Sequence, residues 1–220
     1  MSDHPTLALS GSNLTGDAPF SAALRVGDAL HAAASPPGGR GDLAGLVAGL
    51  CATAGLMPAD VRTVRVDVGP GSYTGLRVAL TFVRFLQRFG AVDVQAIDSL
   101  ALLAARARAA ADRRVHAVLD ARRERVHWQA FDVGPRGVAV AAPAAALPLA
   151  EAVARVGCGL VVAPAALPAA LQAAFAAAGA ELALHTRVVA AEMFAAPLPF
   201  APAAIADLEP RYLMGSYVED

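Results

Sequence analysis

The residues best suited to chemistry lie in one stretch, VDVGPGSYTGLRVAL, at residues 66–80. Its glycine-rich part separates an apolar run typical of a strand from an apolar run typical of a helix. We call this part the glycine loop; it comprises Gly69, Pro70, Gly71, Ser72, Tyr73, Thr74, Gly75 and Arg77. Backbone N–H groups at the start of a helix attract anions, so the loop could hold a phosphate. A purely structural turn is the alternative, and both interpretations stay open.

Known loop mechanisms fit this pattern poorly. GxGxxxG is one residue longer than the dinucleotide-binding fingerprint, and the acidic residue about 20 positions further on, Asp93, begins a strand instead of ending one. Pro70 stands where a nucleophile elbow needs glycine before Ser72. The chain has no lysine, since all 18 basic residues are arginine, and this excludes a Walker loop and Schiff-base catalysis. A dinucleotide-binding domain remains a second alternative.

Metal-dependent hydrolysis is also disfavoured. No two of the five histidines are three or four residues apart, so a helix cannot present two of them as metal ligands on one face. We therefore predict no metal site and no peptidase activity.

The helix predicted after the loop carries a narrow polar stripe between two apolar flanks. The stripe consists of Arg77, Thr81, Arg84 and Arg88. One flank holds Val78, Phe82, Phe85 and Phe89, and the other holds Leu76, Leu80 and Val83. A surface helix needs only one apolar face, which packs against its own protein. Two apolar flanks therefore indicate that one packs against the sheet and the other against a partner. The alternative is a helix enclosed by its own fold. Together with a neighbouring helix, the expected partner interface is Leu43, Leu46, Val47, Leu50, Val78, Phe82, Arg84 and Phe85.

The elements that position these residues follow a mixed α/β order. Strands are predicted within 5–13, 20–33, 63–68 and 92–98, and helices at 42–54, 76–89 and 99–114. Two strands around a basic turn follow within 115–133, then a third at 137–142 and a helix within 167–180. This order indicates two lobes, with domains at 1–105 and 106–220.

Composition bounds the environment and the partners. Hydrophobic residues make up 56% of the 220, with a mean hydropathy of +0.50, but the apolar stretches are short, alanine-rich and broken by proline. These stretches predict no membrane span, and the first residues lack the pattern of a secretory signal, so we expect a cytoplasmic protein. A net charge of -1 gives no global basic field for nucleic acid.

The identity of the loop residues carries a sharper argument. GPGSYTGLR resembles, nearly residue for residue, the GPGSFTGLR signature of the TsaB (YeaZ-like) family of the glycoprotease-like superfamily. Three further segments resemble that family in order and spacing: AIDSLALLA with Ser99 and Leu100, LDARRERVHWQAF with Asp120 to Arg123, and EPRYL with Pro210, Tyr212 and Leu213. The resemblance covers residues 1 to about 132 and the tail.

What the resemblance implies is an actin-like, Hsp70-like (ASKHA, ribonuclease H-like) fold in two lobes that is not itself a catalyst. TsaB proteins take part in making threonylcarbamoyladenosine in tRNA. They pair with TsaD, the transferase, through helices of the first lobe, and an ATPase, TsaE, joins them. The resemblance implies the same partners here, tRNA through the complex, a homodimer in isolation, and no cofactor of its own beyond ATP or ADP at the junction with the partner.

The chain departs from the family at one chemical position. Where TsaB proteins begin with an Ile-Asp-Thr-Ser strand end, this chain has Leu9, Ser10, Gly11 and Ser12, so the first-strand carboxylate is absent. An active actin-like, ATP-dependent phosphotransferase is the runner-up interpretation. It would require Asp67 or Asp120 as the replacement.

Overall fold

In the computed structural model, the described residues are 4–13, 18–36, 41–108, 110–185, 189–195 and 197–213. The chain divides into two compact units. Unit 1 comprises Met1–Ser99, Val188–Ala195 and Phe200–Pro210, and unit 2 comprises Leu100–Arg187, Ala196–Pro199 and Arg211–Asp220.

Unit 1 is built on a mixed sheet in the order β12-β5-β4-β1-β2-β3. Its strands are β1 (Thr6–Ser10), β2 (Ser21–Val26), β3 (Ala29–Ala34), β4 (Thr63–Asp67), β5 (Asp93–Ile97) and β12 (Ala201–Pro202). β1, β4 and β5 are parallel, whereas β2, β3 and β12 pair antiparallel with their neighbours. The three parallel strands therefore end at the same edge of the sheet.

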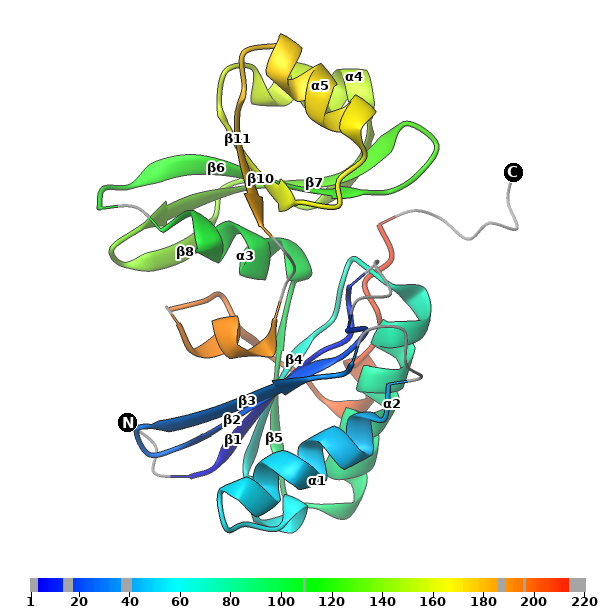
Figure 1. Cartoon of the computed structure of the whole chain (residues 1–220), viewed down its shortest axis with the longest axis vertical. Coiled ribbons are helices and arrows are strands. Elements are labelled where there is room, and N and C mark those ends of the chain that lie inside the picture. The colour runs from blue at the N-terminus through cyan, green and yellow to red at the C-terminus, as the bar shows by residue number, and fades with distance from the viewer. Residues whose placement is uncertain are drawn as a thin grey trace. The chain divides into compact units, whose positions relative to one another are not determined.

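Two helices cover one face of this sheet, as Figure 1 shows: α1 (Leu43–Thr53) and α2 (Tyr73–Phe89). Both begin at polar N-cap residues, Asp42 and Ser72. Asp42 Oδ1 accepts the Gly45 N–H at 2.8 Å, and Ser72 Oγ accepts the Gly75 N–H at 3.2 Å. Because Ser72 is the cap, α2 begins at Tyr73 rather than at the predicted Leu76.

The core of unit 1 lies between these helices and the sheet, where Val64 and Val66 of β4 point. Arg65, between them, points to the opposite face, which carries the 3-10 helix η3 (Ala190–Phe194). The two other 3-10 helices of the unit are η1 (Pro58–Asp60) and η4 (Ile205–Asp207).

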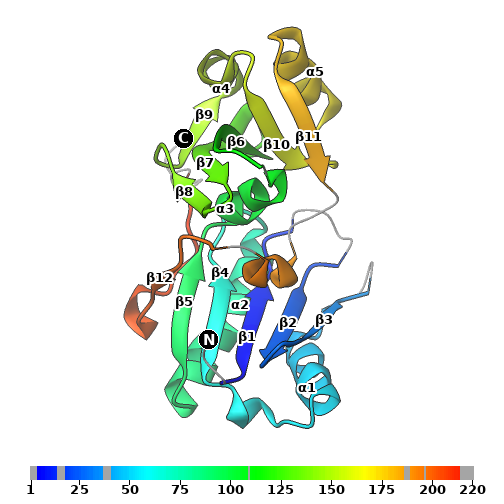
Figure 2. The same cartoon turned by 90° about the vertical axis from the view of Figure 1, so that its left-hand side faces the viewer.

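Unit 2 has a second mixed sheet, in the order β11-β10-β6-β7-β8, with β9 paired to β7. Its strands are β6 (Arg113–Asp120), β7 (Arg125–Gly134), β8 (Gly137–Val140), β9 (Ala145–Pro148), β10 (Leu160–Pro164) and β11 (Glu181–His185). Its helices are α3 (Ser99–Ala104, whose first residue belongs to unit 1), η2 (Ala105–Ala107), α4 (Leu149–Val156) and α5 (Ala169–Ala177). α4 and α5 lie together on one face of the sheet (Figure 2), over a core that includes Trp128 and Phe175.

The two units repeat one topology. Each begins with a three-stranded antiparallel meander, β1-β2-β3 or β6-β7-β8, and continues with helix, strand, helix and strand. Each later pair of strands adds in parallel beside the first strand of its meander. These two mixed sheets flanked by helices confirm the predicted α/β class.

Two sequence predictions differ from this fold. The helix predicted over 99–114 ends early: α3 and η2 stop at Ala107, and β6 already includes Arg113. Residues 100–105 are buried, so this short helix is enclosed in the core and does not form a longer amphipathic surface helix. The sequence analysis also assigned no element to α4, β9, β10 and β11, which lie in the alanine- and proline-rich part of the chain.

Candidate functional site

Polar side chains meet where the three parallel strands of unit 1 end. Ser10 ends β1, Asp67 ends β4, and Ser99 follows β5. The Ser10 hydroxyl donates to Asp67 Oδ2 at 2.8 Å, and the Ser99 hydroxyl donates to Oδ1 at 2.5 Å. The Gly69 N–H also donates to Oδ1, at 2.9 Å, and Ser12 Oγ lies 3.3 Å from Ser10 Oγ. We call Ser10, Ser12, Asp67 and Ser99 the serine–aspartate cluster.

This cluster is closed to solvent. Ser10, Asp67 and Ser99 are fully buried, and Ser12 is 5% exposed. Burial raises the pKa of the Asp67 carboxyl, and the hydrogen bonds from the three serines and from Gly69 oppose that rise. Both carboxyl oxygens accept hydrogen bonds from within the chain, so in this conformation Asp67 presents no free oxygen to a phosphate or a metal ion.

The glycine loop packs directly against the turn that follows β1. A Cβ atom built on Gly75 would lie 2.1 Å from the Gly11 carbonyl oxygen, and one on Gly71 would lie 2.2 Å from the Ser12 carbonyl oxygen. A Cβ on Gly11 would lie 2.5 Å from the Gly75 oxygen. Glycine is therefore required at these three positions so that two backbone segments can touch.

The same packing occupies the N–H groups that a phosphate would need. The Ser72 N–H donates to the Ser12 carbonyl at 2.9 Å, and the Gly69 and Gly75 N–H groups donate to Asp67 and to Ser72 Oγ. The turn after β1 accepts the Ser72 N–H and lies directly against Gly71 and Gly75. This geometry favours the structural interpretation of the loop over anion binding.

The remaining predicted loop residues are at the surface of α2. Tyr73 and Thr74 are exposed in its first turn. The Arg77 guanidinium donates to the Tyr73 hydroxyl and lies 5.2 Å from the centre of its ring. Arg77 thus points away from the serine–aspartate cluster.

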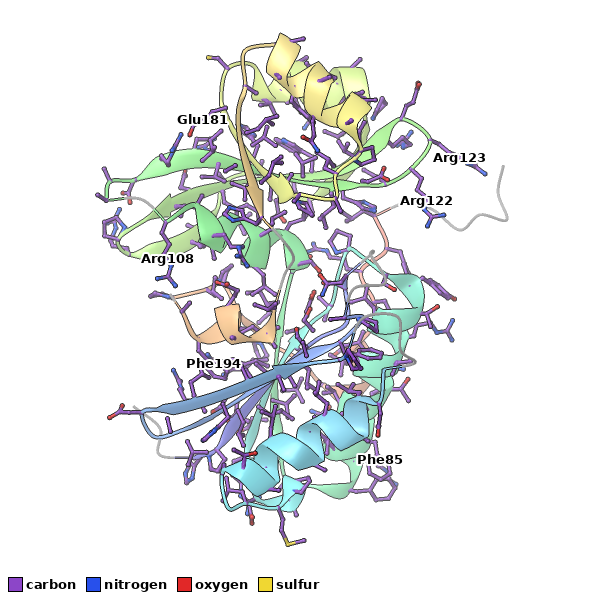
Figure 3. The ribbon with its side chains drawn as sticks, viewed as in Figure 1. Phe85, Arg108, Arg122, Arg123, Glu181 and Phe194 are labelled. Atoms are coloured by element: carbon purple, nitrogen blue, oxygen red, sulfur yellow. The ribbon has the colours of Figure 1, made fainter. Side chains whose placement is uncertain are left out.

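The two apolar flanks of α2 have different environments. The flank with Leu76, Leu80 and Val83 is buried against the sheet. In the other flank Val78 is 41% exposed, Phe85 59% and Phe89 75%, and the Phe85 and Phe89 ring centroids are 4.7 Å apart. Figure 3 shows Phe85 pointing away from the helix and from the rest of unit 1. We call Arg77, Val78, Phe85, Arg88 and Phe89 the α2 face.

Three of the eight predicted interface residues lie in the core. Leu43, Val47 and Leu50 are buried in the core of unit 1, because this flank of α1 faces the sheet. These three side chains are therefore not available to a partner. Leu46, Phe82 and Arg84 are half-buried. Arg84 Nη2 lies 3.4 Å from Glu209 Oε1, so part of this side chain holds the returning C-terminal segment.

Sequence reasoning missed residues at both places. Phe89 was left out of the predicted interface, although its spacing from Val78 and Phe85 puts it on the same side of a helix. Ser12 and Ser99 were not assigned to a site. Ser12 lies at the end of the strand region predicted within 5–13, and Ser99 directly follows the one predicted within 92–98; this position at a strand end was the available signal.

The outer side of α1 consists of small residues. Its exposed positions include Ala44, Gly45, Ala48, Gly49 and Ala52. A Cβ atom added to Gly49 would meet no atom within 4 Å. A partner helix could therefore approach α1 closely.

The described residues form neither a metal-binding cluster nor a membrane-spanning helix. No group of three or more His, Cys, Asp and Glu side chains among them is arranged to hold a metal ion. None of the helices formed by them combines the length and the apolar character that crossing a bilayer requires.

The family model described as "TsaD: tRNA N6-adenosine threonylcarbamoyltransferase" matches residues 41–214. This chain belongs to the TsaD family. No curated protein matches the sequence of this TsaD-family chain.

Solved structures resemble this TsaD-family chain over nearly its whole length. "YeaZ from Pseudomonas aeruginosa" is 22% identical with a TM-score of 0.71, covering 96% of this chain and 100% of that chain. A second structure is 21% identical with a TM-score of 0.74 and the same coverage. It is described as an uncharacterized protein with similarity to peptidase YEAZ from Pseudomonas aeruginosa. The predicted likeness to YeaZ-like proteins is thus confirmed at the level of the fold, and the family model supports a divergent member of the glycoprotease-like group.

Proposed function

We propose that this TsaD-family chain is a non-catalytic partner subunit of the bacterial complex that makes N6-threonylcarbamoyladenosine at position 37 of tRNA. It acts in the cytoplasm by binding and supporting a TsaD-type transferase, with a TsaE-type ATPase as a further partner and tRNA reached through the complex. The observation that carries this proposal is the α2 face, where three large apolar side chains lie on the surface of one helix.

The α2 face has the composition of a binding surface. Aromatic and arginine side chains are enriched among the residues that contribute most to protein interfaces. Phe85 and Phe89 form one exposed aromatic pair, with Arg77 and Arg88 on the same helix. The small residues of α1 on the same side of the sheet would let a partner helix approach the backbone. A partner with a complementary helix pair fits this surface, and a second copy of the chain is the expected occupant when the transferase is absent.

The non-catalytic role is supported by the closed edge of unit 1. The N–H groups of Gly69, Ser72 and Gly75 and both oxygens of Asp67 are occupied within the chain. An autonomous phosphotransferase would need a reachable carboxylate there. A dinucleotide site would need a loop open to a pyrophosphate, and here the turn after β1 lies directly against Gly71 and Gly75. ATP or ADP at the junction with the partner remains compatible with this role.

The interface is tested by measuring binding to the cognate transferase with the variant Phe85→Ala. Truncating a central aromatic contact costs about 2 kcal/mol or more, so the affinity should fall roughly 30-fold or more. Met57→Ala is the matched control, because Met57 is 68% exposed and lies outside the α2 face. Unchanged affinity of the Phe85 variant, or an equal loss in the control, would exclude the α2 face as the interface.

The function itself is tested by reconstitution. The chain is mixed with its transferase, the ATPase, the synthase that makes the threonylcarbamoyl adenylate, tRNA, ATP, threonine and bicarbonate, and modified adenosine is measured with and without it. Formation of the product should depend on the chain. If the product forms equally without it, the proposed function is wrong.

A further inference from the structure

The turn between β6 and β7 in unit 2 has an uncommon backbone. Three successive non-glycine residues, Arg122, Arg123 and Glu124, have φ angles of +64°, +49° and +57°. This left-handed region brings Cβ close to the following carbonyl, so each of these side chains raises the free energy of the turn. Glycine would remove that cost at every one of the three positions. A strained segment of this kind indicates that the side chains themselves are needed.

Hydrogen bonds hold this turn in one shape. Asp120 Oδ1 accepts the Arg122 N–H at 2.7 Å, and the Arg122 carbonyl accepts the Arg125 N–H at 3.0 Å. The Glu124 carbonyl accepts the Leu149 N–H at 2.9 Å, which ties the turn to the start of α4. The Arg125 guanidinium donates to the Ala146 carbonyl at 2.9 Å and so braces the turn against β9. Among the side chains of the turn, those of Asp120 and Arg125 therefore help to fix its shape.

Arg122 and Arg123 are exposed and point away from the sheet, as Figure 3 shows. Four described arginines of unit 2 form ion pairs within the chain: Arg113 with Glu181, Arg114 with Asp132, Arg136 with Asp112, and Arg155 with Glu151. No ion pair with a carboxylate of the described residues neutralises Arg122. Residues 100–187 hold ten arginines against six acidic residues, a net charge of +4.

We propose that this turn, with Arg122 and Arg123 at its tip, binds the phosphate backbone of RNA. Adjacent guanidinium groups on a rigid turn suit phosphodiester oxygens, because each planar fork can donate two parallel hydrogen bonds. Contacts of this kind position a nucleic acid without reading its sequence. The choice of RNA over another polyanion rests on the proposed function in tRNA modification.

The test compares the double variant Arg122→Gly/Arg123→Gly with the wild type. Glycine removes both guanidinium groups and also fits the left-handed backbone, so thermal stability should stay the same or rise. Binding of an unmodified tRNA transcript, followed by fluorescence anisotropy between 50 and 200 mM salt, should weaken roughly tenfold. The slope of log affinity against log salt should fall by about 1.8, since each lost phosphate contact contributes about 0.9. The matched control, Arg136→Gln, removes an exposed, ion-paired arginine at the other end of β7 and should change neither quantity.

The measurement is made with the chain alone and with its complex with the transferase, so that two failures are separated. If the double variant forms the complex and that complex binds tRNA as tightly as the wild-type complex, the proposed RNA contact is wrong. The proposed function is unaffected by that result. If the double variant weakens binding to the transferase but not binding of tRNA to the assembled complex, the turn contacts an acidic protein surface and the proposal is wrong. Absence of salt-dependent tRNA binding in both wild-type samples, or lower stability of the double variant, also overturns it.

Discussion

Replacing Asp67 tests whether the serine–aspartate cluster holds the glycine loop in place. Asp67→Ala removes the acceptor of three hydrogen bonds, from Ser10, Ser99 and the Gly69 N–H, at a fully buried position. An unpaired buried donor costs about 1–3 kcal/mol. The serine hydroxyls can turn toward each other, since Ser10 Oγ and Ser12 Oγ are 3.3 Å apart, but the Gly69 N–H has no such option. We therefore expect Asp67→Ala to lower the free energy of unfolding by roughly 3–5 kcal/mol at pH 4.

Asp67→Asn is the conservative partner of this variant. Its amide keeps the shape, its oxygen can accept from Gly69, and its NH₂ can donate to a serine oxygen. We expect a loss of about 1–2 kcal/mol at pH 4.

The pH dependence has a defined sign. The pKa of Asp67 is raised above its ordinary value of 3.8 mainly by burial. The contribution of Asp67 to the free energy of unfolding is therefore complete below pH 3.8. It decreases by about 1.4 kcal/mol per pH unit as the pH rises toward the pKa of Asp67 in the folded state. Neither variant has a titrating group at this position. The wild type should accordingly approach Asp67→Asn as the pH rises, while the two variants keep a constant difference.

The assay is urea unfolding between pH 4 and 7, monitored by far-ultraviolet circular dichroism. The helices α1 and α2 of unit 1 contribute to this signal. Fluorescence of Trp128, the one tryptophan of the chain, reports on unit 2 and serves as an internal control. An Asp67→Ala variant within 1 kcal/mol of the wild type at pH 4, or a pH-independent difference between wild type and Asp67→Asn, would refute the reasoning.

Two further predictions concern a pair of glycines in unit 1 and a histidine in unit 2. Gly75→Ala should strongly destabilise unit 1 in thermal unfolding, because the new Cβ would lie 2.1 Å from the Gly11 oxygen. Gly49→Ala, where the Cβ meets no atom within 4 Å, should instead stabilise by about 0.5–1 kcal/mol, and equal effects would contradict the close packing. Burial lowers the pKa of His127 from 6.5 to about 4, so its contribution to stability is complete above pH 6.5 and falls as the pH drops toward 4. Unfolding followed by Trp128 fluorescence should show a loss of about 2 kcal/mol between pH 6.5 and 5 that His127→Gln largely removes, and a variant with the same loss would contradict this.

Much of unit 1 could be predicted because apolar and polar residues alternate clearly along several of its elements. β4 and β5 alternate apolar and polar residues, and α1 follows Asp42 as its polar cap, whereas α2 begins three residues before the predicted Leu76. In the later half of unit 2 the helix predicted within 167–180 contains α5, whose buried residues are Leu171 and Phe175. No helix was predicted at α4, where alanine occupies both a buried position, Ala152, and exposed positions, Ala150 and Ala154. The division into domains at 1–105 and 106–220 stays a prediction.

The candidate site shows a different limit of the sequence. The spacing of α1 defines an apolar flank but not what the flank faces, and the structure turns Leu43, Val47 and Leu50 toward the sheet. Likewise, the loss of a carboxylate at Ser10 is visible in the sequence, but its consequence is not. Asp67 lies 57 positions away along the chain and 2.8 Å away across the ends of β1 and β4. A carboxyl group therefore remains at this edge of the sheet, supplied by a neighbouring strand and buried.

The repeated topology explains why the two units use equivalent turns differently. In unit 1 the turn after β1 folds inward, because Gly71 and Gly75 let the glycine loop touch it. In unit 2 the turn after β6 has the same place in the repeat, but the connection between β10 and α5, residues 165–168, contains no glycine. The glycines that allow close backbone contact in unit 1 are therefore missing at this place in unit 2. Arg122 and Arg123 of the β6–β7 turn are exposed at the surface. One equivalent turn is closed by the chain itself and the other is open to a partner, which fits a protein that works by binding.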